Sequence, residues 1–117
     1  MSYRDNIAWD KGMKLVVDVY EFSECLPRSQ RFVLLPQIQR SVTAIPSNIA
    51  EGYGRSTKLD YARFVDIALG STRELQTQLE LCERLNYGST QVLIERAEEI
   101  ARILYGLSKS LRKQNGS

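Results

Sequence analysis

The sequence predicts an all-α protein, folded as an up-down-up-down four-helix bundle with a proline-kinked second helix. Four segments carry apolar residues at helical spacing, and no segment shows the alternation of a strand. The segments run for about 20 to 30 residues and short loops join them, which favours antiparallel packing of neighbours. With 117 residues, 43% of them hydrophobic and 26% charged, the chain fits one domain over residues 1–117. We expect residues 1–7 and 114–117 to be flexible ends.

The first helix is predicted from about Ala8 to Leu26, where the following Pro27 ends it because the residue before a proline leaves helical geometry. Its apolar residues form two stripes that lie side by side, which indicates a helix in contact with two neighbours. One stripe contains Trp9, Met13, Val16, Val17 and Tyr20, and the other contains Leu15, Val19, Phe22 and Leu26.

The second helix is predicted from Phe32 or Leu35 to Tyr53, with a stripe made by Ile38, Val42, Ile45 and Ile49. Pro46 lies in its interior. A proline there removes a backbone hydrogen bond at a cost of about 3 kcal/mol, so we expect a kink. Gly52 and Gly54 suit a helix end that requires a left-handed residue.

The third helix is predicted to begin after Ser56 or Thr57 as N-cap and to run to about Leu85, with Asn86-Tyr87-Gly88 closing it. Gly70 interrupts it, either as a point of close helix packing or as a weak spot. The fourth helix begins near Ser89 or Thr90 and frays after Lys113. The expected core positions are Tyr61, Val65, Ala68, Thr72, Leu75, Leu79 and Cys82 in the third helix, and Leu93, Ala97, Ile100, Leu104, Leu107 and Leu111 in the fourth.

Histidine is absent, which removes the commonest general base and the usual catalytic triads, so we expect no enzymatic activity. Cys25 and Cys82 stand far apart and lie among helical apolar positions, so we interpret them as reduced core thiols and not as a disulfide or a metal site. We expect no metal and no cofactor. No apolar run approaches the ~20 residues of a membrane span, and the N-terminus lacks a signal-peptide core, so a cytoplasmic location without membrane contact is predicted.

The charge pattern predicts one basic end. An up-down-up-down bundle gathers the start of the first helix, the turn between the second and third, and the end of the fourth. Four carboxylates there, Asp5, Asp10, Glu51 and Asp60, face nine cations. Such an end suits a phosphate backbone, with Tyr3 and Tyr53 near enough to stack on bases, although solubility alone also explains it. The cations are Arg4 and the candidate nucleic-acid-binding residues Lys11, Lys14, Arg55, Lys58, Arg63, Lys109, Arg112 and Lys113.

Two long stretches of the chain are similar to a known family. QIQRSVTAIPSNIAEGYGRST at residues 37–57, FVDIALGSTRELQTQLELCERLNY at residues 64–87 and the Trp9-x-Lys11-x-Met13 start resemble the bacterial four-helix-bundle family first described as ribosomal RNA intervening-sequence proteins. The resemblance extends from about Trp9 to Arg112. Pro36 departs from it, because a polar residue is expected there, and this affects only where the second helix begins.

The resemblance implies a four-helix bundle assembled as a homo-oligomeric ring, often of five subunits, without a recognised catalytic site. A distant branch comprises accessory proteins of diversity-generating retroelements, which are basic pentamers that bind a reverse transcriptase and nucleic acid. The predicted function is therefore a non-enzymatic oligomer that binds RNA or DNA through its basic end. The alternative is a protein–protein adaptor or scaffold, for example for a reverse transcriptase or a ribosome-related factor.

The signature residues Pro46, Asn48, Glu51 and Gly52 surround the expected kink. Carbonyl groups freed by the proline can bind a ligand together with Asn48 and Glu51. The more common arrangement is that such polar side chains satisfy the freed backbone groups or mend a contact between subunits. The Gly52-Tyr53-Gly54 run is a turn and not a dinucleotide fingerprint, because no strand precedes it and a third glycine is missing.

Overall fold

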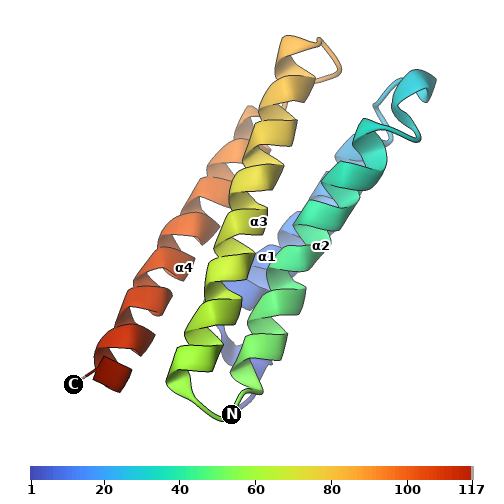
Figure 1. Cartoon of the computed structure of the whole chain (residues 1–117). Helices are drawn as coiled ribbons and strands as arrows, with labels where there is room; N and C mark the ends of the chain where they lie inside the picture. Colours follow the sequence, from blue (N-terminus) through green and yellow to red (C-terminus); the bar gives the residue numbers. More distant parts are fainter. Residues whose placement is uncertain (117) are drawn as a thin grey trace.

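The computed structural model describes residues 1–116, with side chains for residues 1–114. Its α-helices are α1 (Ile7–Ser23), α2 (Leu34–Tyr53), α3 (Lys58–Arg84) and α4 (Gln91–Gly116), and two 3-10 turns, η1 (Tyr3–Asp5) and η2 (Arg28–Gln30), lie before and after α1. The helices form an elongated bundle of 50 × 21 × 20 Å in which each packs beside the next and α4 returns to α1 (Figure 1). The predicted all-α four-helix bundle is confirmed.

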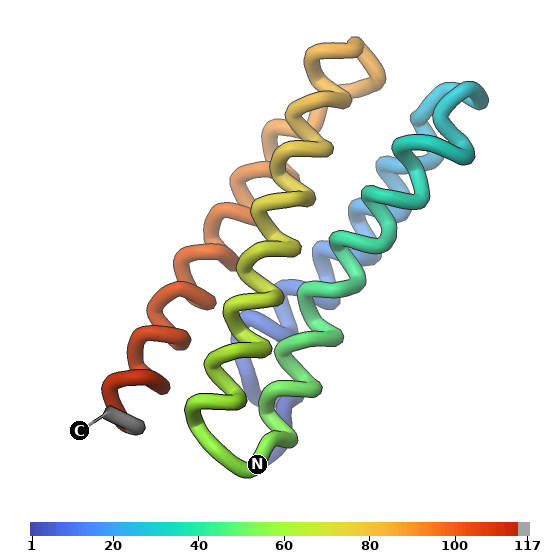
Figure 2. The backbone as a smooth tube through the Cα atoms, in the orientation of Figure 1, coloured from blue at the N-terminus to red at the C-terminus, as the bar shows by residue number. Residues whose placement is uncertain are grey.

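The chain reverses direction after every helix, so the bundle has two distinct ends (Figure 2). The N-terminus, the α2–α3 turn and the end of α4 lie together at one end. The α1–α2 connection and the α3–α4 turn lie at the other. This is the arrangement on which the predicted charge polarity depends.

The predicted stripes of α2, α3 and α4 make one core. Ile38, Val42, Ile45 and Ile49 of α2 are fully buried, and the expected positions of α3 and α4 are buried or half-buried. Helical spacing alone located them because each of these helices keeps one apolar face towards its neighbours. The largest fully buried side chains of the other helices are Leu15, Val19, Val65, Thr72, Leu75, Leu79, Ile100 and Leu104.

Helix α1 differs from its prediction in two ways. It ends at Ser23 and not at Leu26, because residues 24–26 bond to carbonyls three positions back and the last turn tightens ahead of Pro27. One of its two stripes lies in or against the core, and the other reaches the core only through the half-buried Trp9 and Val16. Leu15 and Val19 are fully buried, whereas Met13, Val17 and Tyr20 of the other stripe are exposed to solvent. The early end of α1 also leaves Cys25 exposed, so the expectation of two core thiols is wrong for Cys25 and right for Cys82.

Helix α2 continues through Pro46, and the ring of this proline faces α1. A side chain at Gly12 of α1 would meet Pro46 Cδ at 3.5 Å and Ile45 Cγ2 at 3.4 Å, so the two helices approach closely here. The amide of Asn48 donates to the Ala44 carbonyl at 2.8 Å. Asn48 therefore bonds a backbone carbonyl, but not that of Val42, which is the one that a proline at position 46 leaves without its usual donor.

The prediction of a left-handed glycine at the end of α2 is wrong. Gly52 lies within the helix and Gly54 has φ −82°, which any residue adopts. Gly52 is required for space instead, because a Cβ there would lie 2.7 Å from Phe64 Cβ and 3.0 Å from Tyr61 Cδ1 of α3. The signature glycine therefore marks the point where α2 and α3 touch.

Helix α3 begins with one of its two predicted caps, Thr57, and α4 begins at Gln91, next to its predicted start. The hydroxyl of Thr57 accepts from the Asp60 amide at 3.1 Å, and the α3–α4 turn closes with Asn86 at φ 60°, which lets the Tyr87 amide donate to the Cys82 carbonyl at 2.8 Å. Thr90 is buried, and its hydroxyl donates to the Leu79 carbonyl at 2.8 Å. No atom lies within 4 Å of a Cβ built on Gly70, so this glycine is not a point of close packing inside the described chain.

The ends of the chain carry more structure than we expected. Residues 1–7 include the η1 turn, in which Ser2 and Asp5 form a capping box, and the first residue of α1. Helix α4, expected to fray after Lys113, continues to Gly116. Ser117 lies outside the described residues.

Candidate nucleic-acid interface

Three lysines at one end of the bundle have no carboxylate partner among the described residues. Lys58 opens α3, and Lys109 and Lys113 lie one turn apart near the end of α4. The Lys58 ammonium donates to Gln114 Oε1 at 2.5 Å, which ties the start of α3 to the end of α4. Lys109 lies 5.4 Å from the centre of the Tyr105 ring. We call the surface made by Lys58, Lys109 and Lys113 the lysine end.

The other predicted cations on α2, α3 and α4 are paired with acids. Arg55 lies 3.0 Å from Glu51 and 3.9 Å from Asp60, and Asp60 also accepts Arg63 at 3.4 Å. Arg112 pairs with Asp66, whose other oxygen accepts the Ser108 hydroxyl at 2.6 Å. These arginines stay at the predicted end, but a nearby carboxylate offsets each of them, so they add little to the positive potential that a polyanion would meet.

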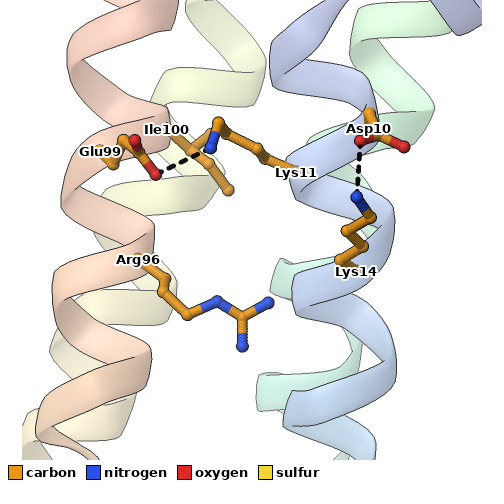
Figure 3. A pocket seen from close by; sticks show the side chains of 6 residues that line it. All are labelled: Asp10, Lys11, Lys14, Arg96, Glu99 and Ile100. Carbon is orange, nitrogen blue, oxygen red and sulfur yellow. Dashed lines mark ion pairs between the residues drawn. The ribbon is translucent and has the colours of Figure 1, made fainter.

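Lys11 and Lys14 lie on the side of the bundle, in a pocket of about 200 Å³ between α1 and α4 (Figure 3). Lys11 bridges to Glu99 of α4 at 3.2 Å, and Lys14 pairs with Asp10 of its own helix at 3.0 Å. Arg96 of α4 extends towards α1 and meets Asp18 at 2.5 Å. The pocket therefore holds opposite charges that join the α1–α4 seam, and its two lysines do not add to the lysine end.

The aromatic residues expected to stack on bases are already in contact with other rings. Tyr3 packs edge-on against Trp9 at 5.3 Å, and Tyr53 packs edge-on against Tyr61 at 6.0 Å. Burial raises the pKa of the Tyr61 phenol, although a hydrogen bond from Asn6 acts in the opposite direction. These ring contacts thus stabilise the N-terminal segment and the α2–α3 turn. Tyr53 is 37% exposed to solvent.

Two exposed apolar grooves at the opposite end were not expected. The α1–α2 groove, about 360 Å³, is lined by Val17, Tyr20, Glu21, Ser23, Glu24, Leu35 and Gln39. The α3–α4 groove, about 450 Å³, is lined by Arg73, Gln76, Thr77, Glu80, Leu81, Arg84 and Ile94. The α1 stripe that contains Val17 and Tyr20 could have indicated the α1–α2 groove from the sequence. The second groove had no clear signal, because its apolar residues are few and widely spaced in sequence.

The described residues offer little for metal or acid–base chemistry. They hold no group of three or more histidine, cysteine, aspartate or glutamate side chains placed to bind a metal. Hydrogen bonds from Gln76 and Arg73 lower the pKa of Glu98, which is opposite to the shift that a general acid needs. Burial raises the pKa of the Cys82 thiol, which makes it a poor nucleophile.

A family model for the 23S rRNA-intervening sequence protein matches residues 4–106. The chain belongs to this family. The match includes the signature around Gly52, all of α3 and the part of α4 up to Gly106, so the resemblance noted in the sequence is confirmed.

A solved structure has a similar fold. The chain is 29% identical to a protein of unknown function from the S23 ribosomal protein family of Bacteroides thetaiotaomicron, with a TM-score of 0.82 over 90% of this chain and 97% of that one. No curated protein matches the chain significantly. None of the described helices combines the length and the apolar character needed to cross a membrane.

Proposed function

We propose that this member of the intervening-sequence protein family is a non-enzymatic, cytoplasmic homo-oligomer that binds RNA or DNA through its lysine end. Five copies are the number that the family resemblance favours. The proposal includes no cofactor and no membrane contact. It assigns binding to Lys58, Lys109 and Lys113, with the paired Arg55, Arg63 and Arg112 at their margin, and removes Lys11 and Lys14 from the binding surface.

One observation supports the nucleic-acid part of the proposal. The three lysines lie where α3 begins and α4 ends, and no carboxylate among the described residues neutralises them. Cations held without acids attract phosphate groups through counterion release, and several copies side by side multiply the effect.

A protein–protein adaptor is the second candidate, because the two grooves expose apolar surface at the end opposite the lysines. Val17, which lines the α1–α2 groove, is 65% exposed. Phe32, three residues before Leu35 of the same groove, is 87% exposed. Large exposed apolar side chains that lie together mark sites of protein contact.

The nucleic-acid proposal is tested by fluorescence anisotropy with a single-stranded RNA and a duplex DNA over a range of salt concentrations. We expect binding that weakens steeply with salt. Replacing the three lysines together (K58E, K109E and K113E) should lower the salt slope for a single strand by roughly 2, at about 0.7 for each lost contact.

The matched control changes charge equally at other exposed cations that have no ion pair among the described residues, with R28E, R40E and R102E. If both triple variants bind equally, the lysine end is not the site. Absence of wild-type binding at low salt removes the nucleic-acid function altogether and leaves the adaptor.

A further inference from the structure

Tyr105 of α4 is the most exposed of the six tyrosines, with 57% of its surface open to solvent. Tyr3 and Tyr53, which we expected to stack on bases, are held against other rings. Tyr105 contacts no other aromatic ring among the described residues. Its ring is therefore available to a flat group from outside the chain.

The part of α4 that carries Tyr105 has no acidic residue. Residues 100–116 include lysines and arginines but neither aspartate nor glutamate. The nearest acids of the helix, Glu98 and Glu99, lie about two turns before the ring, and both form ion pairs with other helices. Arg102 follows these acids by one turn, so we leave it outside the site. The surface from Tyr105 to the end of the helix is thus uniformly positive or neutral along α4.

Tyr105, Lys109 and Lys113 lie in one row along the helix, because residues four apart in a helix are neighbours on its surface. All three are exposed, and the Lys109 ammonium lies 5.4 Å from the centre of the Tyr105 ring. At the far end of the row, Lys58 of α3 bonds to Gln114 and adds a third cation. We call Tyr105, Lys109, Lys113 and Lys58 the tyrosine–lysine row.

Gly106, next to the ring, leaves space at the surface of α4. It is exposed, and no atom lies within 4 Å of a Cβ built on it. Glycine inside a helix lowers helix propensity, and no contact in the described chain requires it at this position. A residue without a side chain lets a ligand approach the helix backbone closely. The space beside Tyr105 therefore suits a flat group that lies against the ring.

An exposed ring followed by cations has the chemistry that binds single strands. A base stacks on the ring, and the phosphates of the following nucleotides meet the cations. A duplex keeps its bases stacked in its interior, so it can use the lysines but not the ring. The helix rises about 12 Å from Tyr105 to Lys113, which is the length of roughly four stacked nucleotides at about 3.4 Å each.

We propose that the tyrosine–lysine row binds single-stranded nucleic acid in preference to a duplex. One base stacks on Tyr105, and the phosphates that follow contact Lys109, Lys113 and Lys58. This inference rests on the proposed function and specifies its ligand as a single strand. It also adds Tyr105, a residue that the sequence interpretation did not select, to the binding surface.

The test compares one RNA strand with the same strand annealed to its complement, by fluorescence anisotropy. Wild-type protein should bind the single strand more tightly than the duplex. Y105A should weaken binding of the single strand by about tenfold, because one base loses its stacking partner, and should change binding of the duplex by less than about twofold. Light scattering and circular dichroism check that the variant keeps its assembly and its fold.

Substitutions at the same position separate stacking from apolar bulk. Y105F keeps the ring and should bind like the wild type, whereas Y105L keeps a large apolar side chain without a ring and should bind like Y105A. Stacking adds no phosphate contact, so Y105A should leave the salt slope unchanged. K109Q with K113Q should instead lower that slope by about 1.4 for a single strand, at about 0.7 for each lost contact.

The outcomes separate this inference from the proposed function. Wild-type protein that binds neither probe at low salt contradicts the proposed function. Binding of the single strand that Y105A and Y105L leave unchanged, or a wild type that binds the duplex equally well, contradicts the role of the ring but leaves the lysine end standing. A Y105A variant with a changed assembly mass would place the ring between copies and would also contradict the stacking site.

Discussion

The two ends of this bundle are built differently. At the lysine end, α2 and α3 come into close contact at Gly52, Tyr53 packs edge-on against Tyr61, and three lysines have no carboxylate partner among the described residues. At the opposite end, the connections are held by polar caps such as Thr90, and apolar side chains such as Phe32 face outward. Both ends carry the same kind of helices, joined by short connections.

The two ends therefore suit two different kinds of contact. An end closed by tight packing holds charges at fixed positions, which suits contact with a regularly charged partner. An end with exposed apolar grooves gains free energy when another protein covers them. Substitutions that act on one end only therefore test whether the two ends are independent.

The largest effect is expected from Gly52→Ala at the lysine end. The new methyl group would lie 2.7 Å from Phe64 Cβ and 3.2 Å from the Tyr61 carbonyl oxygen, so α2 and α3 must separate. We expect a loss of about 1–3 kcal/mol in the free energy of unfolding, measured by chemical denaturation. The matched control is Gly70→Ala, which has open space and should gain up to about 1 kcal/mol from helix propensity. Equal effects of the two changes would contradict the close contact at Gly52.

The two cysteines allow a comparison near the apolar end. Cys82 is fully buried in the core and Cys25 is exposed. Cys82→Ser places a hydroxyl in apolar surroundings and should lower stability by about 1–3 kcal/mol, whereas Cys25→Ser should change it by less than about 0.5 kcal/mol. Thiol labelling should follow the same order, because burial raises the pKa of the Cys82 thiol and reduces its thiolate fraction. Rapid labelling of both thiols in the native state would contradict this packing.

Thr90→Val tests the cap that holds the α3–α4 turn. The substitution keeps the shape of the side chain but removes the hydroxyl bond to the Leu79 carbonyl, and the bond from the Thr90 amide to Glu83 remains. We expect a loss of about 1 kcal/mol in the free energy of unfolding. Native hydrogen exchange should accelerate most at the α3–α4 turn. Acceleration confined to the α2–α3 turn would show that the two ends are not independent.

The smallest effect is expected between the ends, at Glu98. Hydrogen bonds from Gln76 and Arg73 lower its pKa below the ordinary 4.5. A lowered pKa means that this carboxylate stabilises the fold at pH values above 4.5 and that the contribution disappears as the pH falls through the lowered value. Glu98→Gln should therefore cost a few tenths of a kcal/mol at neutral pH and nothing in acid, by denaturation at both pH values. A difference that grows on acidification would contradict the direction of the shift.

Local sequence pattern predicted the helices and most of the core because apolar residues recur at helical spacing, and it predicted the Thr57 cap because that bond spans three residues. It did not predict which carboxylate would meet which cation. Lys11 finds Glu99 and Arg112 finds Asp66, and these pairs depend on the axial offset of helices far apart in sequence. The role of Gly52 was missed for the same reason, because its constraint comes from Phe64 on another helix and not from its own backbone angles.

The central claim is that the lysine end binds nucleic acid and does not join the copies of the proposed oligomer. The most direct test is sedimentation of the K58E, K109E and K113E variant with a labelled single-stranded RNA, followed beside the wild type. We expect the wild type to carry RNA in its oligomer boundary, and the variant to sediment at the same oligomer mass without RNA. RNA retained by the variant, or a variant that falls to monomers, would contradict the separation of the two ends.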